Sequence, residues 1–303
     1  MNLKILNPHL ISALRPEQWT KNFLVFSAPL FSYSDNKLTW LYALVTFICF
    51  CFISSSVYLI NDVLDIEADR NHHKKHKRAI ASGLVSTKEA ILLSIFLILI
   101  GFLVSLMVDI RVLIVLILYL LIQFSYCLHF KKLPLLDIFC IASGFLLRAI
   151  AGGLAGGLFI SPWFLISVTL SALFLAIEKR KAELIWSNKT GKFNRRVLRF
   201  YSIDLLVKFE NTVTSSSFIF YTLWASGPIL NGAPTEWMLL TVPFVLLGIF
   251  RYQQISEPIE NNSQQSYIIK TENPEEILLK DNFIKIIIIF WISTTFIIGY
   301  FFA

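Results

Sequence analysis

Charged residues are scarce in this chain of 303 residues, in which Asp, Glu, Lys and Arg together make up 16%. An ordinary soluble domain would carry roughly a quarter, so the composition excludes that class. Cysteine is scarce as well: there are four, with no C-x-x-C pair, and each lies in an apolar stretch. We therefore expect small buried cysteine side chains and no disulfide framework. No cleavable signal peptide is predicted, because the first apolar run follows Arg15 and Lys21 without a small-residue cleavage pattern.

Apolar residues are abundant, at 56% of the chain with 27 Phe. A run of about 18 or more apolar residues indicates a membrane span, because a helix needs about 20 residues to cross the hydrocarbon layer. Backbone groups in lipid must be satisfied within the span, which favours helices. The sequence predicts an all-α integral membrane protein, with residues 1–303 forming one polytopic domain. Nine spans are predicted, at 22–36, 39–60, 89–108, 110–128, 134–155, 161–178, 203–226, 235–252 and 283–302.

Basic residues set the expected orientation, because Lys and Arg accumulate in cytoplasmic connections. With the N-terminus in the cytoplasm, 24 of the 27 Lys and Arg residues fall on the cytoplasmic side. Lys37 and Arg111 fall on the other side, and Arg148 lies inside a span. The sequence therefore predicts a multi-pass protein of the cytoplasmic (inner) membrane, with its long charged loops in the cytoplasm. This asymmetry accounts for most of the net charge of +7, so no nucleic-acid partner is expected.

An acidic segment follows the second predicted span. At about 100° per residue, a continuing helix would place three carboxylates on one face, extended toward the membrane by Tyr58, while Glu67 would point away. Oxygen ligands of this kind suit Mg²⁺, which bridges to substrate phosphates. The alternative is an amphipathic helix with a solvated acidic face. The position at the mouth of a span favours a magnesium site, with metal-binding and catalytic roles for Asp62, Asp65 and Asp69.

The pattern Asn61-Asp62-x-x-Asp65-x-x-x-Asp69 resembles the first aspartate-rich signature of the UbiA-type intramembrane prenyltransferase superfamily. The resemblance implies nine helices around a central cavity, with a Mg²⁺-diphosphate bound by this motif. Further segments are similar to the polyprenyl-phosphate phosphoribosyltransferase branch of that superfamily, which takes phosphoribose from phosphoribosyl pyrophosphate. These segments lie, in order, at 15–22, 74–83, 137–153, 179–184 and 274–281.

The end of the sixth predicted span separates the branches. Members that use prenyl diphosphates carry a second aspartate-rich motif there, whereas this chain reads Glu178-Lys179-Arg180-Lys181-Ala182-Glu183. Three adjacent cations are poor metal ligands but suit a bare phosphate. Positive-inside charge is the simpler explanation for the more distal basic residues, and interfacial anchoring or snorkelling is the alternative for several others. The predicted substrate-binding residues are Lys21, Tyr58, Asn61, Lys77, Arg78, Tyr126, Lys131, Arg148, Lys179, Arg180 and Glu183.

The acidic motif and the membrane spans are compatible with three functions. The favoured one is Mg²⁺-dependent transfer of 5-phosphoribose from phosphoribosyl pyrophosphate to a polyprenyl phosphate, a step typical of cell wall precursor biosynthesis. The second is prenyl transfer from a polyprenyl diphosphate to an aromatic or other acceptor, which expects the missing second acidic motif. The third is a non-catalytic lipid binder or flippase, which has no need for three concentrated carboxylates. Membrane lipids are further expected partners, and a homo-oligomer is compatible with the sequence.

Overall fold

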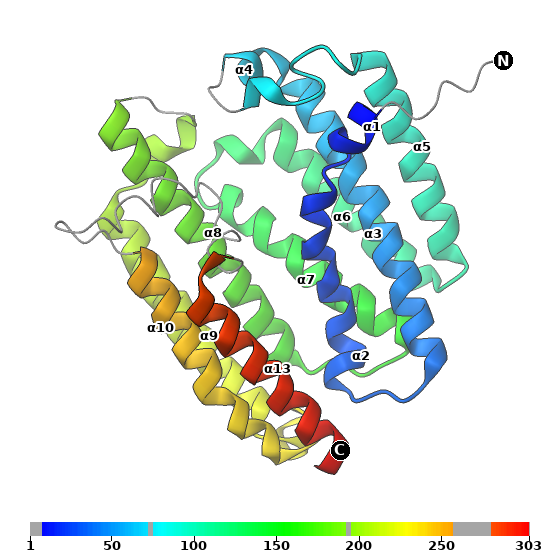
Figure 1. Ribbon diagram of the computed structural model, residues 1–303, viewed down its shortest axis with the longest axis vertical. Coiled ribbons are helices and arrows are strands. Elements are labelled where there is room, and N and C mark those ends of the chain that lie inside the picture. Colours follow the sequence, from blue (N-terminus) through cyan, green and yellow to red (C-terminus); the bar gives the residue numbers. More distant parts are fainter. Residues whose placement is uncertain (1–7, 72–74, 192–194, 257–279, 303) are drawn as a thin grey trace. The chain divides into compact units, whose positions relative to one another are not determined.

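The structure is a computed structural model and describes residues 8–71, 75–191, 195–256 and 280–302. Every regular element within these ranges is helical (Figure 1), which confirms the predicted all-α class. The chain divides into two compact units, which are described separately. The first unit comprises Met1–Leu30, Ser34–His129 and Leu147–Phe159, and the second comprises Phe31–Tyr33, Phe130–Leu146 and Ile160–Ala303. The prediction of a single membrane domain stays a prediction. Residues 72–74 and most of the 274–281 pattern lie outside the described residues.

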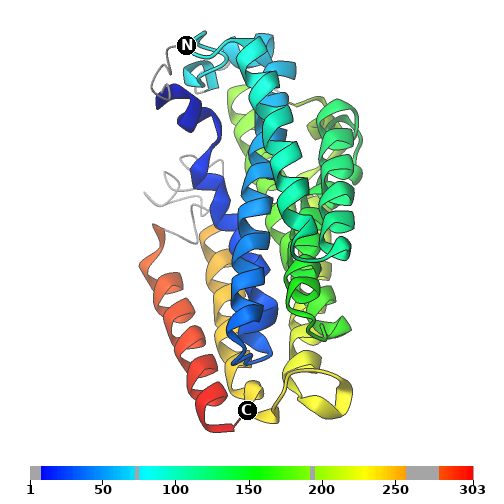
Figure 2. The same cartoon turned by 90° about the vertical axis from the view of Figure 1, so that its right-hand side faces the viewer.

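The first unit is organised around a long helix, α3, which packs against α5, α6 and the irregular segment η1. Figure 2 shows α3 and α5 running side by side. Across this interface the Ser94 hydroxyl of α5 donates to the Ser56 carbonyl of α3 at 3.2 Å, and Gly101 of α5 lies against the Ile53 side chain. The elements of this unit are α1 (Pro8–Ala13), η1 (Pro16–Phe26), α3 (Lys37–Leu64), α4 (Ile66–Arg70), η2 (Lys75–Lys77), α5 (Thr87–Leu106) and α6 (Ile110–Leu128).

Short polar side chains define where these helices begin. The Asn36 side chain accepts a hydrogen bond from the Leu38 amide at 2.9 Å and caps α3. Ser86 and Glu89 form a reciprocal capping box at the start of α5. Asp109 accepts from the Arg111 amide at 2.6 Å and caps α6. Each cap satisfies a backbone donor that has no partner inside its own helix, so the helix starts are encoded locally.

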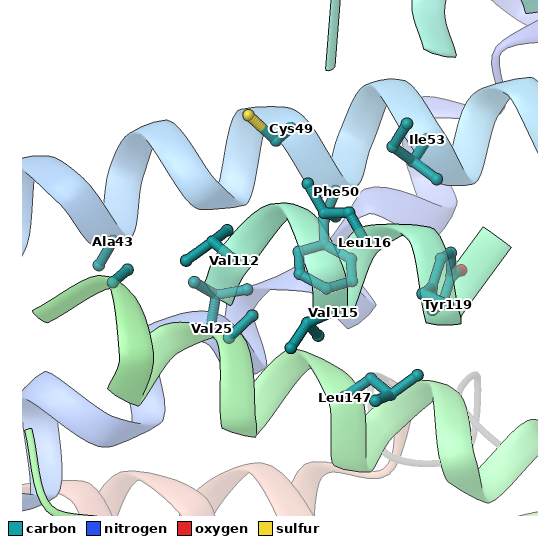
Figure 3. Packing of buried hydrophobic residues seen from close by; sticks show 12 residues of the cluster. Val25, Ala43, Cys49, Phe50, Ile53, Val112, Val115, Leu116, Tyr119 and Leu147 are labelled. Atoms are coloured by element: carbon teal, nitrogen blue, oxygen red, sulfur yellow. The ribbon is translucent and has the colours of Figure 1, made fainter. Parts of the chain in front are cut away.

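A hydrophobic core joins α3, α6, η1 and the second half of α7 (Leu136–Gly156) in the first unit. Figure 3 shows the Phe50 ring between α3 and α6, with Val115 and Leu147 nearby. Phe50, Leu116 and Val25 are completely buried. The backbone of η1 approaches α7 closely at Gly152, where an added Cβ would lie 1.9 Å from the Val25 carbonyl oxygen. Position 152 therefore has no room for a side chain.

The second unit pairs its helices in sequence order: α8 packs against α9, and α10 packs against α13. One core contains Ile138 from the first part of α7, Leu173 from α8 and Leu206 from α9. A second core joins α8, α10 and α13 through Phe174, Tyr252 and Ile284. The elements are α2 (Ser27–Phe31, which ends in this unit), η3 (Phe130–Lys132), α8 (Pro162–Thr190), η4 (Arg196–Phe200), α9 (Ile203–Ala225), η5 (Pro228–Leu230), η6 (Glu236–Thr241), α10 (Val242–Ser256) and α13 (Asn282–Phe302).

Seven helical segments within the described ranges are long and apolar enough to cross a membrane, so the predicted count of nine is not confirmed. The predicted first span, 22–36, consists of the end of η1 and the short helix α2. The seventh, 203–226, forms helix α9, but Lys208, Glu210 and a run of Ser and Thr make it more polar. The seven segments are Lys37–Leu64, Thr87–Leu106, Ile110–Leu128, Leu136–Gly156, Pro162–Asn188, Glu236–Ser256 and Asn282–Phe302.

Candidate functional site

The acidic segment lies where α3 ends and α4 begins. The helix breaks at Asp65, whose φ and ψ are −100° and 12°, so the prediction of one uninterrupted helix is wrong at this residue. Helical spacing nevertheless survives the break, because the Asp65 amide donates to the Asn61 carbonyl and the Asp69 amide donates to the Asp65 carbonyl. Asp62 and Asp69 are buried, while Glu67 is exposed. The predicted outward position of Glu67 is therefore confirmed.

Asp62 and Asp69 converge on one guanidinium group. Nη1 of Arg78 lies 3.2 Å from Oδ1 of Asp62 and 2.6 Å from Oδ2 of Asp69. The turn that carries Arg78 is anchored by buried Ala79 and Ile80, which pack in a core with Leu59 of α3. This anchoring places a basic loop residue beside the acidic segment, and the predicted substrate-binding role of Arg78 stays a prediction.

A second guanidinium reaches Asp62 from the N-terminal segment. Nη2 of Arg15 forms an ion pair with Oδ1 of Asp62, and the Arg15 guanidinium lies 5.0 Å from the centre of the Tyr58 ring. Trp19 fixes this segment on α3 by donating from Nε1 to Oγ of Ser55 at 3.0 Å. Figures 1 and 2 show α1 and α4 at the same end of α3. Arg15 was not among the predicted site residues, although it belongs to the 15–22 segment that carries the family resemblance.

The predicted three-aspartate metal site is not formed as such: within the described ranges, no three His, Cys, Asp or Glu side chains are grouped closely enough to hold a metal ion. Two of the three, Asp62 and Asp69, share a single cationic nitrogen. Their oxygen donors and their convergence on one positive charge fit a Mg²⁺ ion.

The other predicted substrate-binding residues of the first unit differ in how exposed their side chains are. Tyr58 and Asn61 are half-buried on α3, and Lys21 is half-buried on η1. Lys77 is exposed at the end of η2, one residue before Arg78. Tyr126 is half-buried in the last turn of α6. These placements leave the predicted ligand contacts of all five residues as predictions.

Arg148 is held inside the first unit by neutral and aromatic groups. Its Nε donates to Oδ1 of Asn22 at 2.7 Å, and its Nη2 donates to the Tyr119 hydroxyl at 2.9 Å. Its guanidinium also lies 4.9 Å from the Tyr119 ring centre and 5.7 Å from that of Phe50. A cation inside a span needs such partners. Arg148 therefore has a structural role in the first unit, and its predicted ligand contact stays a prediction.

In the second unit, Arg180 is the centre of a buried ion-pair network. Its Nε lies 2.5 Å from Oδ2 of Asp137, and its Nη1 lies 2.7 Å from Oε2 of Glu183. The Tyr201 hydroxyl donates to Oδ1 of Asp137 at 2.7 Å and accepts from the Leu135 amide at 2.7 Å. Burial, together with the Asp137 carboxylate, raises the pKa of Tyr201, so the phenol remains a donor. The network ties the start of α7 to the end of α8.

Lys181 occupies a second buried network, between two carboxylates. Its Nζ lies 3.1 Å from Oε1 of Glu178 and 2.7 Å from Oε2 of Glu210, while Gln253 donates to the other oxygen of Glu210. The expectation of three adjacent cations open to a phosphate needs correction, because Lys181 and Arg180 are buried and neutralised by carboxylates. Lys179 and Glu183 are half-buried on α8, and Lys131 is half-buried in η3; their ligand contacts stay predictions.

The chain is similar to known proteins over most of its length. Residues 23–271 match the model of the UbiA prenyltransferase family. A decaprenyl-phosphate phosphoribosyltransferase of Mycolicibacterium smegmatis is 36% identical over 303 residues, covering 94% of this chain and 90% of that protein. The protein of the same name from Corynebacterium glutamicum is 33% identical, covering 95% of this chain and 86% of that protein.

Solved structures are similar as well. A UbiA homologue from Archaeoglobus fulgidus, solved bound to GPP and Mg²⁺, has a TM-score of 0.69 at 18% identity, covering 96% of this chain and 99% of that one. Identity at that level supports the fold alone. The family match extends over most of the sequence, and the relatives are similar along nearly their whole length. The chain is therefore a multi-pass membrane protein that belongs to the UbiA prenyltransferase family.

Proposed function

We propose that this protein transfers 5-phosphoribose from phosphoribosyl pyrophosphate to a polyprenyl phosphate and releases pyrophosphate, with Mg²⁺ at the cytoplasmic face of the membrane. The names of the full-length bacterial relatives support this choice of substrates. The observation that carries it is the convergence of Asp62 and Asp69 on Arg78, with Arg15 beside them. Carboxylates that suit a divalent cation and guanidinium groups that suit phosphates thus occur together in one place.

Acidic and basic side chains of the site would have different roles in this reaction. Asp62 and Asp69, with Asp65 next to them, would hold Mg²⁺, and the metal would supply neutralisation of the charge that develops on the departing pyrophosphate. Arg78 and Arg15 would bind phosphate oxygens through charge-assisted hydrogen bonds. These contacts would hold the phosphate groups of the donor beside the acidic segment.

The acceptor needs little activation by the protein. A polyprenyl phosphate is anionic, so its oxygen attacks C1 without a strong general base, and attack opposite the leaving group inverts C1. The apolar tail remains in the bilayer, which the spans predict the protein to cross. Since 24 of the 27 Lys and Arg residues are expected on the cytoplasmic side, the soluble donor would approach from the cytoplasm.

Prenyl transfer is less well supported by the residues at the end of α8. In the resembling prenyl-diphosphate enzymes, a second acidic motif at this place helps to bind metal. Two carboxylates of α8, one of α7 and one of α9 are all engaged in ion pairs with Arg180, Arg195 or Lys181. Carboxylates that already neutralise protein cations are poor candidates for a second metal site. They are Asp137, Glu178, Glu183 and Glu210.

The test uses membranes that contain the protein, labelled phosphoribosyl pyrophosphate, polyprenyl phosphate and Mg²⁺. We expect label to become extractable into organic solvent, and this signal to disappear with EDTA. Asp62→Asn and Asp69→Asn should each reduce it at least about a hundredfold, because each removes a proposed metal ligand. Glu67→Gln is the matched control, since Glu67 is an exposed carboxylate of the same segment. Label from a prenyl diphosphate entering an aromatic acceptor would establish prenyl transfer instead.

A further inference from the structure

We infer that Arg15 and Arg78 are placeholders for the metal: in the protein without ligands their guanidinium groups neutralise Asp62 and Asp69, and Arg78 leaves the carboxylates when a divalent cation binds. This inference rests on the proposed function and concerns the regulation of the same site. It assigns to Arg15 a role that the sequence pattern did not predict. We call these four side chains the charge-balanced cluster.

The two buried carboxylates of the charge-balanced cluster need positive charge next to them. The side chains of Asp62 and Asp69 are each only 5% exposed, and two ionised carboxylates at such positions require nearby positive charge. Arg78 forms ion pairs with both carboxylates, and Arg15 forms an ion pair with Asp62. Two negative and two positive groups therefore cancel. One nitrogen, Nη1 of Arg78, lies within hydrogen-bond distance of both aspartates, which is the position that suits a shared metal ion.

Arg15 and Arg78 are the members of the cluster that are able to move away from their partners. The side chains of Arg15 and Arg78 are 23% and 27% exposed, whereas their carboxylate partners are almost completely buried. The Arg180–Asp137 pair of the second unit differs, because both of its side chains are fully buried. Guanidinium groups that already reach solvent can leave without unpacking a core.

The backbone of Arg15 adds a third observation. Its φ is 53° and its ψ is 63°, in the left-handed region, and Pro16 follows it. A non-glycine residue in this region is strained. The ion pair with Asp62 and the contact with the Tyr58 ring accompany this conformation. The strained backbone of Arg15 therefore coincides with the ion pair to Asp62.

Charge balance then couples the metal to the diphosphate. A divalent cation alone must compete with Arg78 and leaves the cluster with two surplus positive charges. A diphosphate that arrives with the cation supplies the missing negative charge and accepts hydrogen bonds from the released guanidinium groups. The free cation and the cation–diphosphate complex should therefore respond in opposite directions when Arg78 is removed.

The experiment measures binding of Mn²⁺, observed by electron paramagnetic resonance, to the purified full-length protein in detergent. Free Mn²⁺ and the preformed Mn²⁺–pyrophosphate complex are titrated separately. Arg78→Gln should bind free Mn²⁺ about tenfold more tightly than the wild type and the complex about tenfold more weakly, a usual size for coupling between ligands. Arg78→Lys keeps the positive charge, so its affinity for each ligand should lie between the affinities of the wild type and of Arg78→Gln. Arg70→Gln is the matched control, because Arg70 donates to the Ala81 carbonyl and not to a carboxylate.

If Arg78→Gln binds free Mn²⁺ no more tightly than the wild type, Arg78 does not compete with the metal and the inference is wrong. If this variant does not fold, Arg15→Gln replaces it, with the same opposite changes at smaller size because Arg15 contacts Asp62 alone. A wild type that transfers phosphoribose, together with unchanged binding by these variants, refutes only this inference. A wild type that neither binds the complex nor transfers phosphoribose refutes the proposed function with it.

Discussion

Nε of Arg180 lies 2.5 Å from Oδ2 of Asp137, and neither side chain has any exposed surface. The two residues are 43 positions apart in sequence and come from α8 and α7. A buried charge without its partner is strongly unfavourable. The pair therefore adds a buried ionic contact to the apolar core through which these two segments of the second unit pack.

Asp137→Ala should lower the free energy of unfolding by about 3–5 kcal/mol, because it removes the carboxylate that contacts Nε of the buried Arg180 guanidinium and leaves that group with less compensating negative charge. Unfolding in detergent, followed by tryptophan fluorescence, measures the loss. The double variant Asp137→Leu with Arg180→Met should recover part of it, since apolar groups need no charge partner. Asp109→Asn is the control from an exposed ion pair with Arg111 and should change little. A single variant as stable as the wild type would contradict the prediction.

Tyr201→Phe should lower the free energy of unfolding by about 1 kcal/mol near neutral pH, because Asp137 loses a hydrogen-bond donor. Since burial raises the pKa of Tyr201 in the folded protein, its stabilising contribution is fully present below the unfolded pKa of about 10. That contribution is lost as the pH rises above this value. The stability gap between wild type and variant should therefore narrow above pH 10 in parallel unfolding measurements. A gap that stays constant or widens would show that the folded-state pKa is not raised.

Gly152→Ala should destabilise the first unit by about 3 kcal/mol, a typical upper value for overpacking. The added Cβ would lie 1.9 Å from the Val25 carbonyl oxygen, and a backbone atom cannot move aside by changing a rotamer. Gly248→Ala is the matched control, because its nearest neighbour there is Cγ2 of Ile287 at 3.9 Å. Thermal unfolding of both variants in the same detergent compares them. Equal melting temperatures would mean that η1 does not approach α7 as closely as the structure has it.

Arg148→Lys should also destabilise the protein, by about 1–3 kcal/mol, although it keeps the positive charge. A single ammonium cannot reproduce the forked donation to Asn22 and Tyr119, and one buried polar group then lacks a partner. Arg251→Lys is the control, because the Arg251 side chain is 30% exposed in its pair with Asp281. Thermal unfolding distinguishes the two. A loss of transfer activity in Arg148→Lys at unchanged stability would instead indicate ligand contact.

The sequence by itself determined the features that depend on neighbouring residues. Long apolar runs became helices because lipid leaves the backbone no other way to satisfy its hydrogen bonds. Ser86 and Glu89 encode the start of α5 through a capping box spanning three residues. The helical spacing of the acidic motif correctly predicted the outward position of Glu67. It also placed Asp62 and Asp69 on a common face, where both are buried and meet Arg78.

Only the tertiary structure decided which charges meet. Arg15 reaches Asp62 across 47 positions because the N-terminal segment lies along α3. Three adjacent cations at 179–181 looked open to a phosphate, yet two of them are buried against carboxylates from other segments. Helical spacing likewise gave no sign of the break at Asp65. Charge pairing over such separations depends on how helices pack, and packing is a property of the whole fold that no local pattern contains.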